Sequence, residues 1–522
     1  MATPLGKVVP QTGTDYIDGL VQGSKWDSGN LTYSFWNTES WPIPFYQFYW
    51  TDYGVQQFEA ALQEYEHIAN LSFARVYPEG TVTNNSSDMS IYYQYLVLPI
   101  AMGGIPDPEY IDGILDSIML GREGYPTAEG DVLLPPFAQL VPNHVNEGGG
   151  GFQIFIHEIG HALGLKHTHD DGLNGRPTFE ELGLPDNQLY TVMSYNQISD
   201  VPEKGFPATL MPFDIAAIQY IYGANMTYHA GDDVYTLTDD GLVKTIWDAG
   251  GTDTFTAENS QISVVISLRE GQFSIHGALR NGSFSSPNAD GYLETADSYS
   301  MTAIAYDVTI ENAIGGSASD HLQGNSANNQ LIANSGNDTV FGDTGADTLI
   351  GGEGADYLQG NQGMDSIDGG TGDDEIRGGK DSDTITAGAG NDWINGNIGN
   401  DTVDAGDGND VVRGGKDADT LYGAAGDDTI YGDLGNDFML GGDGSDAFVF
   451  GQNSGVDTVG DFVQGEDVIQ LATDYYISTE DALAALVYQT DAVSLDLGNG
   501  NEIHIMGSYD ADSFTTADVM LV

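Results

Sequence analysis

Three histidines and a glutamate lie within the eleven residues HEIGHALGLKH, from His157 to His167. His157 and His161 are four residues apart, so on a helix they would lie on one face and could bind a common ion. Glu158, next to the first histidine, could polarise a water molecule bound to that ion. Three neutral imidazoles with a fourth position open to water are typical of a catalytic zinc rather than a closed structural zinc.

A helix must carry His157 and His161 and then end, so that His167 can approach the same ion. Gly164 is suited to that end, because glycine readily adopts the left-handed conformation that terminates helices. His169 is close enough in sequence to compete as a ligand, but we expect it to be a solvated loop residue.

A second segment, YTVMSY, contains Met193 and, two residues later, Tyr195. On its own it is a weak signal, because the chain has 28 tyrosines and a buried methionine is usually a core residue. Together with the extended histidine motif it predicts a Met-turn, in which the methionine lies beneath the zinc.

The elements that position these residues follow from the periodicity of residues 16–225, which predict a domain of mixed α and β structure. Apolar residues recur at helical spacing in 54–69 and 211–225, and the second helix has Ile215, Ile218 and Ile221 on its inner face. Alternation predicts strands at 31–36, 70–77 and 88–95.

A strict repeat follows from residue 315 to residue 449, where the chain divides without a gap into fifteen nonapeptides such as GGEGADYLQ. The eighth residue of every unit is apolar, and the sixth is Asp in all units except one, which has Asn329. A flexible glycine-rich linker would not keep this phase. Fixed glycines, a fixed Asp and a fixed apolar residue predict a calcium-binding parallel β-roll.

Each position of the nonapeptide has a physical role in such a roll. Glycines permit left-handed turns, the Asp provides the hard oxygen that calcium prefers, and the last three residues form a short strand. Two nonapeptides are expected to make one coil, with calcium between neighbouring turns. The expected calcium ligands are Asp338, Asp347, Asp356, Asp365, Asp374, Asp383, Asp392, Asp401, Asp410, Asp419, Asp428, Asp437 and Asp446. Weaker binding is expected at the unit with Asn329 and where Asp381 and Asp417 replace a glycine.

Composition restricts the classes of partner. The net charge is −65, which repels nucleic acid and anionic lipid and excludes DNA binding. The chain has no cysteine, so a metal must be bound by histidine, oxygen ligands or tyrosine. No apolar run is long enough to span a membrane, and the first twenty residues lack the apolar segment of a signal peptide. We expect no membrane insertion.

The chain resembles the serralysin-type metalloproteases, in which a metzincin domain precedes a calcium-loaded β-roll. Besides the histidine motif and the repeats, the resemblance rests on LMPFDIAAIQYIYGAN, KTIWDAGGTDTF, VTIENAIGGSASD and DTVGDFVQGEDVIQL, and it covers most of residues 13–471. It implies an α+β catalytic domain at 16–225 and a parallel β-roll at 315–449. Residues 1–15 would be an N-terminal segment or short propeptide, 226–314 a β-rich connection, and 450–522 a C-terminal β region of β-sandwich type.

The resemblance also implies a function, a secreted zinc endopeptidase that hydrolyses proteins and is stabilised by calcium. His157, His161 and His167 would bind one zinc, with Tyr195 as a further ligand that moves away to stabilise the transition state. Glu158 would be the general base. The strand at 88–95 would be an edge strand that pairs with the substrate. Export would use an ABC-type exporter that reads an uncleaved C-terminal signal, and we expect a monomer.

Two other functions remain as alternatives. A calcium-dependent adhesive or surface-layer protein could retain a vestigial protease domain, but such a site tends to lose Glu158 or a histidine, and all are present. Another exported β-roll enzyme, such as a lipase or an epimerase, would leave the zinc motif unexplained. The sequence does not indicate the cleavage preference, the natural substrate or any inhibitor.

Overall fold

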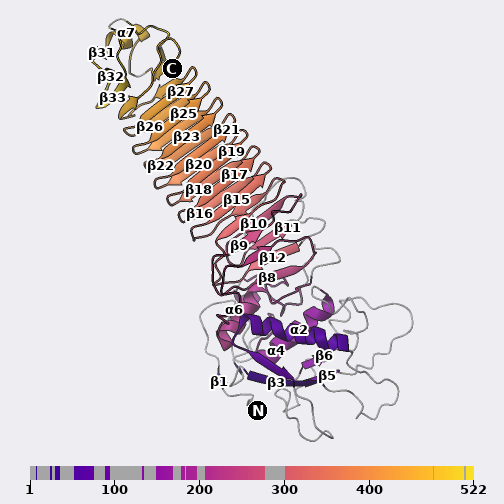
Figure 1. Cartoon of the computed structure of the whole chain (residues 1–522). Helices are drawn as coiled ribbons and strands as arrows, with labels where there is room; N and C mark the ends of the chain where they lie inside the picture. The colour runs from indigo at the N-terminus through magenta and orange to yellow at the C-terminus, as the bar shows by residue number, and fades with distance from the viewer. Residues whose placement is uncertain are drawn as a thin grey trace, which may run out of the picture.

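The computed structural model describes residues 7–8, 24–25, 30–35, 52–75, 89–93, 132–134, 149–168, 178–182, 184–196, 206–276, 300–473, 475–510 and 513–522. An α/β part near the N-terminus lies at one end of the molecule, and a long stack of strands leads away from it towards the C-terminus (Figure 1). This order confirms the predicted fold class, an α+β domain followed by a parallel β-roll.

The α/β part contains four helices and a small parallel sheet among the described residues. The helices are α2 (Asp52–Ile68), α4 (Gly150–Leu163), α5 (Phe179–Leu182) and α6 (Pro212–Tyr222). The sheet has the order β4-β3-β5-β6, with β3 at Asn30–Phe35, β4 at Ser72–Arg75, β5 at Met89–Tyr93 and β6 at Val132–Leu134. A separate two-stranded pair joins β1 (Lys7–Val8) and β2 (Ser24–Lys25).

The prediction that the strand at 88–95 is a free edge is wrong. Strand β5 pairs with β3 on one side and with β6 on the other, where Ile91 faces Val132. Its backbone donors and acceptors are therefore shared with two neighbours, and a substrate could not add to it as an extra strand.

Apolar stripes hold the helices together. Phe58 and Tyr65 of α2 are fully buried, and the ring of Phe58 meets that of Phe155 on α4 edge to face at 5.4 Å. The predicted inner face of α6 is also buried, with Ile215, Ile218 and Ile221 no more than 1% exposed. Helix α4, which carries the histidine motif, is itself mostly buried, with Phe152, Phe155, Ile156, Ile159 and Leu163 no more than 1% exposed.

The rest of the described chain forms two fourteen-stranded sheets that face each other. One has the order β34-β30-β28-β26-β24-β22-β20-β18-β16-β14-β10-β11-β12-β8 and is called sheet E below. The other, sheet F, has the order β31-β32-β33-β29-β27-β25-β23-β21-β19-β17-β15-β13-β9-β7.

The strands that lead into the roll are β7 (Val234–Thr236), β8 (Val243–Ile246), β9 (Thr254–Thr256), β10 (Val264–Ser267), β11 (Phe273–His276), β12 (Ser300–Ile304), β13 (Asn312–Ile314) and β14 (His321–Gln323). Those of the repeats are β15 (Gln330–Ser335), β16 (Thr339–Thr344), β17 (Thr348–Glu353), β18 (Tyr357–Gln362), β19 (Ser366–Thr371), β20 (Glu375–Lys380), β21 (Thr384–Ala389), β22 (Trp393–Ile398), β23 (Thr402–Asp407), β24 (Val411–Lys416), β25 (Thr420–Ala425), β26 (Thr429–Leu434), β27 (Phe438–Asp443) and β28 (Ala447–Phe450). The last elements are β29 (Val456–Val459), β30 (Val468–Leu471), α7 (Thr479–Ala484), β31 (Val487–Tyr488), β32 (Ala492–Gly498), β33 (Asn501–Met506) and β34 (Val519–Leu521).

The register of the roll confirms that two nonapeptides make one coil. Each repeat strand pairs in parallel with the strand two places along, so Thr348 lies opposite Ser366, eighteen residues later. The strands are six residues long rather than the predicted three. They continue into the next nonapeptide, where residues such as Asn361 (φ 81°) bend the backbone without ending the pairing.

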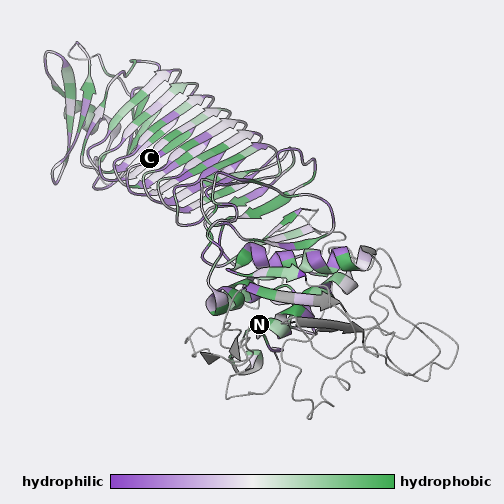
Figure 2. Ribbon diagram, turned by 60° about the horizontal axis from the view of Figure 1, so that its bottom comes forward, coloured by the Kyte–Doolittle hydropathy of each residue, from purple (hydrophilic) through white to green (hydrophobic). Residues whose placement is uncertain are grey.

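The interior of the roll is a column of the eighth residues. All fifteen of them, from Leu322 to Phe448, are no more than 2% exposed. Their neighbours along each strand point outwards, so hydrophobic and hydrophilic positions alternate along the stacked strands (Figure 2). The roll is thus held by a narrow apolar core between two ladders of backbone hydrogen bonds.

Candidate metal centres

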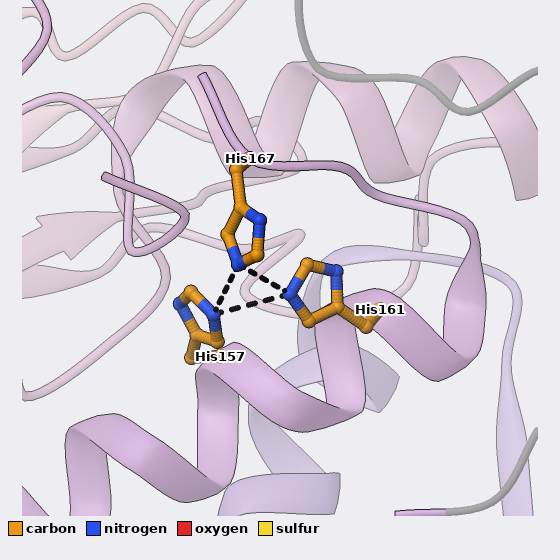
Figure 3. Close-up of side chains that lie close together, drawn as sticks. All are labelled: His157, His161 and His167. Atoms are coloured by element: carbon orange, nitrogen blue, oxygen red, sulfur yellow. Dashed lines mark hydrogen bonds between the residues drawn. The ribbon is translucent and has the colours of Figure 1, made fainter. Parts of the chain in front are cut away.

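The three motif histidines converge on one point at the end of helix α4 (Figure 3). The Nε2 atoms of His157 and His161 are 3.1 Å apart, and those of His161 and His167 are 2.9 Å apart. The Nε2 atoms of His157 and His167 are separated by 3.3 Å. Ligands on a tetrahedral zinc with Zn–N bonds of about 2.0–2.1 Å would be about 3.3 Å apart, so the triangle is of the right size for that ion.

Hydrogen bonds on the far side of two rings define which nitrogen carries the proton. His157 Nδ1 lies 2.7 Å from the Val192 carbonyl oxygen, and His161 Nδ1 lies 2.9 Å from that of Leu165. A carbonyl only accepts, so each Nδ1 donates and each Nε2 is left with a lone pair. Lone pairs of neutral imidazoles that face each other at this distance repel unless a cation lies between them. The donor set therefore fits a zinc ion.

The end of α4 turns the chain back towards this point. Gly164 has φ 107° and ψ 15°, a left-handed conformation that residues with a side chain rarely adopt. The Leu165 amide then donates to the Gly160 carbonyl at 2.9 Å, which closes the turn before His167. His169 lies outside the described residues.

Tyr195 and Met193 approach the histidines from the next segment. The Tyr195 hydroxyl is 2.6 Å from His167 Nε2, and its ring stacks on His157 with centroids 5.5 Å apart. Met193 is fully buried beneath α4. A Cβ atom at Gly160 would be only 2.9 Å from the Met193 sulfur, so a glycine within the motif lets the methionine pack directly under the histidines.

A buried carboxylate, Asp214, ties this turn to α6. It accepts hydrogen bonds from Thr191 Oγ1 at 2.5 Å, from the Val192 amide at 2.7 Å and from the Met211 amide at 3.0 Å. Val192 in turn provides the carbonyl that accepts from His157. Sequence reasoning assigned no role to Asp214. The signal available was an acid at the third position of a helix that begins with proline, which by itself indicates only a helix cap.

Glu158 directly follows the first histidine on α4. Its side chain retains partial contact with solvent, yet desolvation by the surrounding protein raises its pKa to about 8. A group with a raised pKa near neutrality can both accept and release a proton. A cation beside it would oppose this shift.

The thirteen Asp residues expected to bind calcium form two buried columns along the roll, each no more than 3% exposed. One oxygen of each, Oδ1, accepts from the backbone amide of the residue eighteen positions earlier, as Asp356 does from Asp338 at 2.7 Å. The other oxygen, Oδ2, is buried and has no hydrogen-bond partner in any of the thirteen. Buried acceptors without partners are costly, and a row of them fits a set of hard cations.

The pKa values of these carboxyl groups are raised, in all of them by desolvation and in most of them also by neighbouring carboxylates. Desolvation raises the pKa of Asp383 and that of Asp419 to about 8. The charge of Asp401 contributes to both shifts. Such shifts show that the negative charges are unfavourable where they stand, and a bound cation would remove that penalty.

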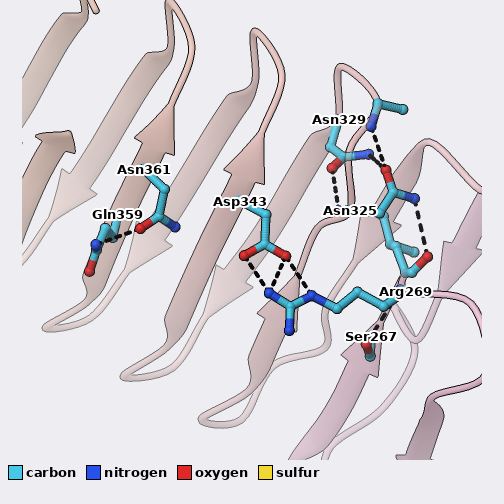
Figure 4. A network of polar contacts seen from close by, with 9 residues as sticks. Ser267, Arg269, Asn325, Asn329, Asp343, Gln359 and Asn361 are labelled. Carbon is cyan, nitrogen blue, oxygen red and sulfur yellow. Dashed lines mark hydrogen bonds and ion pairs between the residues drawn. The ribbon is translucent and has the colours of Figure 1, made fainter. Parts of the chain in front are cut away.

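The one unit with Asn329 behaves differently. Its Oδ1 accepts from the Asn325 amide at 2.8 Å, and its Nδ2 donates to the Glu311 carbonyl at 2.9 Å and to Asn325 Oδ1 (Figure 4). The amide is therefore satisfied without an ion, as expected for a weak unit. In the other two units named as weak, Asp381 and Asp417 take the left-handed conformation of the missing glycine, with φ 75° and 79°.

Two family models match separate parts of the chain. Residues 25–187 match the matrixin peptidase model, and residues 314–349, 350–385, 377–412 and 413–448 match the RTX calcium-binding nonapeptide repeat. The chain therefore combines a matrixin domain with RTX repeats. The first model implies a catalytic zinc, and the second implies bound calcium, in agreement with the two kinds of site described above.

Curated relatives named serralysin are similar to this chain. Serralysin B from Dickeya chrysanthemi is 33% identical over 56% of this chain and 58% of its own length. A serralysin from Photorhabdus laumondii is 32% identical over 59% of this chain and 62% of its own length, and one from Proteus mirabilis is 37% identical over 34% and 36%. The chain thus matches about three fifths of the length of the first two.

A solved structure of the extracellular lipase LipA from Serratia marcescens also matches part of the chain, with 15% identity and a TM-score of 0.17 over 43% of this chain and 44% of that one. Among the helices that the structure describes, none has both the length and the apolar character that a membrane-spanning helix requires.

Proposed function

We propose that this protein is a zinc-dependent endopeptidase that hydrolyses peptide bonds of other proteins. The observation that carries the proposal is the convergence of the Nε2 atoms of His157, His161 and His167 within 3.3 Å of one another. The matrixin match over residues 25–187 and the likeness to serralysins support the same activity.

Each side chain at this site has a role that its chemistry allows. When bound, zinc would supply a Lewis acid that polarises the scissile carbonyl and makes water a nucleophile near neutral pH. Glu158 would accept the proton of the attacking water and deliver it to the departing amine nitrogen. The Tyr195 hydroxyl, which contacts His167 at rest, would donate a hydrogen bond to the oxygen of the scissile carbonyl as that oxygen becomes negative.

We further propose that the protein acts outside the cell after export by an ABC-type exporter that reads its C-terminal region. Buried carboxylate oxygens without partners support a roll that requires calcium, an ion that is abundant outside cells and scarce in the cytosol. The competing function, a calcium-dependent adhesive or surface-layer protein with a vestigial protease domain, predicts a damaged site. Three converging histidines beside Glu158 and Tyr195 argue against such damage.

The test is hydrolysis of casein by the purified full chain in calcium. Activity should disappear with the zinc chelator 1,10-phenanthroline and return with added zinc.

Glu158→Gln should lower turnover by about 10²-fold or more while zinc remains bound, because it removes the general base and no ligand. His161→Ala should lose zinc and activity together in elemental analysis. Near-normal turnover of the Glu158→Gln protein would contradict the assigned mechanism, and inactivity of the zinc-loaded wild type would favour the adhesive function.

A further inference from the structure

The basic residues of the roll are few and lie together. Residues 315–449 contain only four, Arg377, Lys380, Arg413 and Lys416, in a chain whose net charge is −65. They occur in two copies of the pentapeptide RGGKD that are separated by 36 residues. Because one coil takes eighteen residues, the two copies lie two coils apart on the same sheet.

The register places equivalent residues of the two copies in rows that run along sheet E. Arg377 pairs with Asn395, which pairs with Arg413, and Lys380 pairs with Ile398, which pairs with Lys416. Two strand spacings separate the members of each pair, which is roughly 10 Å. The outer face therefore presents a cation pair, a neutral strand and a second cation pair.

At the ninth position of the nonapeptide, the outer face of sheet F carries acidic residues, whereas that of sheet E carries basic ones. There the ninth residues form the row Ile350, Asp368, Thr386, Asp404 and Tyr422. On sheet F the acids of this row alternate with neutral residues. On sheet E the arginines Arg377 and Arg413 are likewise separated by the neutral Asn395. Since the repeat itself requires no particular residue at this position, its own folding rules do not account for the difference.

The four cations line one groove of about 680 Å³, together with polar side chains that can form hydrogen bonds. Its other lining residues include Gln359, Asn361, Gln362, Asn395 and Asn397. Gly379 and Gly415, which carry no side chain, also line it. The groove shares Asn361 and Gln362 with a second hollow that extends past Asp343 to Arg269, so the polar surface continues along the sheet (Figure 4).

The two arginines and the two lysines of the groove differ in how far they are engaged by neighbouring residues. The Arg377 guanidinium lies 5.5 Å from the ring centre of Tyr357 and 5.4 Å from that of Trp393, and Arg413 lies 4.8 Å from Tyr431. The arginines also bind acids of the same face, Arg377 to Glu375 at 2.6 Å and Arg413 to Asp433 at 2.7 Å. Both lysines are exposed, and no salt bridge to either is found among the described residues. They are therefore the charges most available to a ligand.

We infer that this groove binds an anionic, uronate-containing polysaccharide that lies along the roll. Carboxylates of an extended chain would meet Lys380 and Lys416, and the amides would bind its hydroxyl groups. The site is separate from the histidine centre, and it would hold the protein on a polysaccharide matrix whether or not the protein hydrolyses peptides.

Two other polyanions fit the observations less well. A nucleic acid carries dense charge on a wide duplex or flexible strand, whereas residues 315–449 offer only four Lys and Arg residues, in two pairs roughly 10 Å apart. An acidic peptide could match the lysines, but its side chains offer few hydroxyl groups to five neighbouring amides. A narrow polymer with sparse, regular charge and many hydroxyls matches both features.

The test measures binding of a fluorescein-labelled hyaluronate decasaccharide to the full chain in millimolar calcium by fluorescence anisotropy. Hyaluronate has one carboxylate in each disaccharide, and we expect binding that weakens as salt is added. Lys380→Gln/Lys416→Gln should bind about tenfold more weakly, because two charge-assisted contacts are lost. Lys380→Arg/Lys416→Arg should restore binding.

The matched control is Thr386→Glu/Thr402→Glu, which changes the net charge by the same amount at exposed positions of sheet F. It should bind like the wild type. No binding by the wild type, or equal losses in the lysine variant and the threonine control, would overturn the inference. Equal or tighter binding of polyglutamate or of duplex DNA would overturn the assignment to a polysaccharide. Circular dichroism of each variant in calcium establishes that the roll is intact.

Discussion

The Tyr195 hydroxyl can form a hydrogen bond with His167 or with the oxyanion of a bound substrate, but not with both at the same time. Its hydroxyl is 2.6 Å from His167 Nε2, a position also close to where an ion held by the three histidines would lie. During the proposed reaction the hydroxyl must leave that contact to donate to the developing oxyanion. The side chain is partly exposed and lies near the end of a turn, so this movement does not require the core to open.

The Tyr195→Phe variant tests this role. We expect kcat to fall by roughly 10²-fold, because one oxyanion donor is removed, while KM and zinc content stay close to those of the wild type. Steady-state kinetics on a fluorogenic peptide with parallel elemental analysis would measure both. An unchanged kcat would make Tyr195 a packing residue that stacks on His157.

At the scale of elements, the turn at 191–195 and helix α4 depend on a carboxylate that neither of them carries. Asp214 accepts three hydrogen bonds, two of them from the turn, and the turn's Val192 carbonyl orients His157. Burial raises the pKa of Asp214 to about 7, while these hydrogen bonds act in the opposite direction. It is a positioning residue because it reaches the metal ligand only through Val192.

Asp214→Asn should therefore weaken both folding and zinc binding. One oxygen of Asp214 accepts both backbone N–H groups, so the amide NH₂ of the variant would take the place of the other oxygen and face the Thr191 hydroxyl. That buried hydroxyl would lose its acceptor, which costs about 1–3 kcal/mol. Thermal unfolding of the calcium-loaded protein and competition with a zinc chelator would measure the two effects. The exposed Asp239→Asn change is the matched control and should alter neither. A stable variant with wild-type zinc affinity would contradict the positioning role.

The elements that could be predicted well from the sequence are those whose signals lie within a few residues of one another. The i, i+4 histidines and Gly164 predict a helix and its end within eleven residues, and the nine-residue phase predicts the coil of the roll. Strand β5 was predicted, but its pairing with β6 was not, because Val132–Leu134 offers only three apolar residues forty positions away. The link from Asp214 to His157 and the basic groove also depend on contacts between distant residues, which a single sequence does not display.

The repeat units allow a prediction with opposite signs in the two calcium states. Asp383→Asn keeps an acceptor at Oδ1 and replaces the unpartnered Oδ2, whose carboxyl group has its pKa raised to about 8 by desolvation and nearby carboxylates. Without calcium the variant should be more stable than the wild type, since a buried charge is removed. With calcium it should be less stable, because a ligand is lost.

Urea unfolding followed by circular dichroism, in chelator and in calcium, would measure both differences. Asp368→Asn, on the exposed outer face of sheet F, removes the same charge without touching a column and is the control. A change of the same sign in both conditions would show that Asp383 does not bind calcium.

For the whole molecule, the dominant fact is that two columns of buried carboxylates must lie side by side for the roll to exist. Calcium is one way to make this arrangement favourable, and protonation is another. The folded roll raises the pKa of these groups to about 6 for Asp365, about 7 for Asp374 and about 8 for Asp383, whereas in an unfolded chain an Asp titrates near 4. The folded, calcium-free roll therefore holds protons more tightly than the unfolded chain does.

The sign of the pH dependence follows from that difference. A group whose pKa is raised by folding stabilises the folded state fully below its unfolded pKa, and this contribution is lost as pH rises through 6 to 8. The calcium-free chain should thus be more folded near pH 5 than near pH 8. With calcium the order reverses, because protons compete with the ion for the same oxygens.

The folded fraction of protein stripped of calcium would be measured across this pH range by circular dichroism. Small-angle scattering would report the length of the roll in the same samples. The double variant Asp383→Asn/Asp419→Asn should show a shallower pH dependence, since two of the groups with the largest shifts no longer titrate. A calcium-free roll that is equally folded at both ends of the range would mean that charge repulsion within the columns is not what keeps it unfolded.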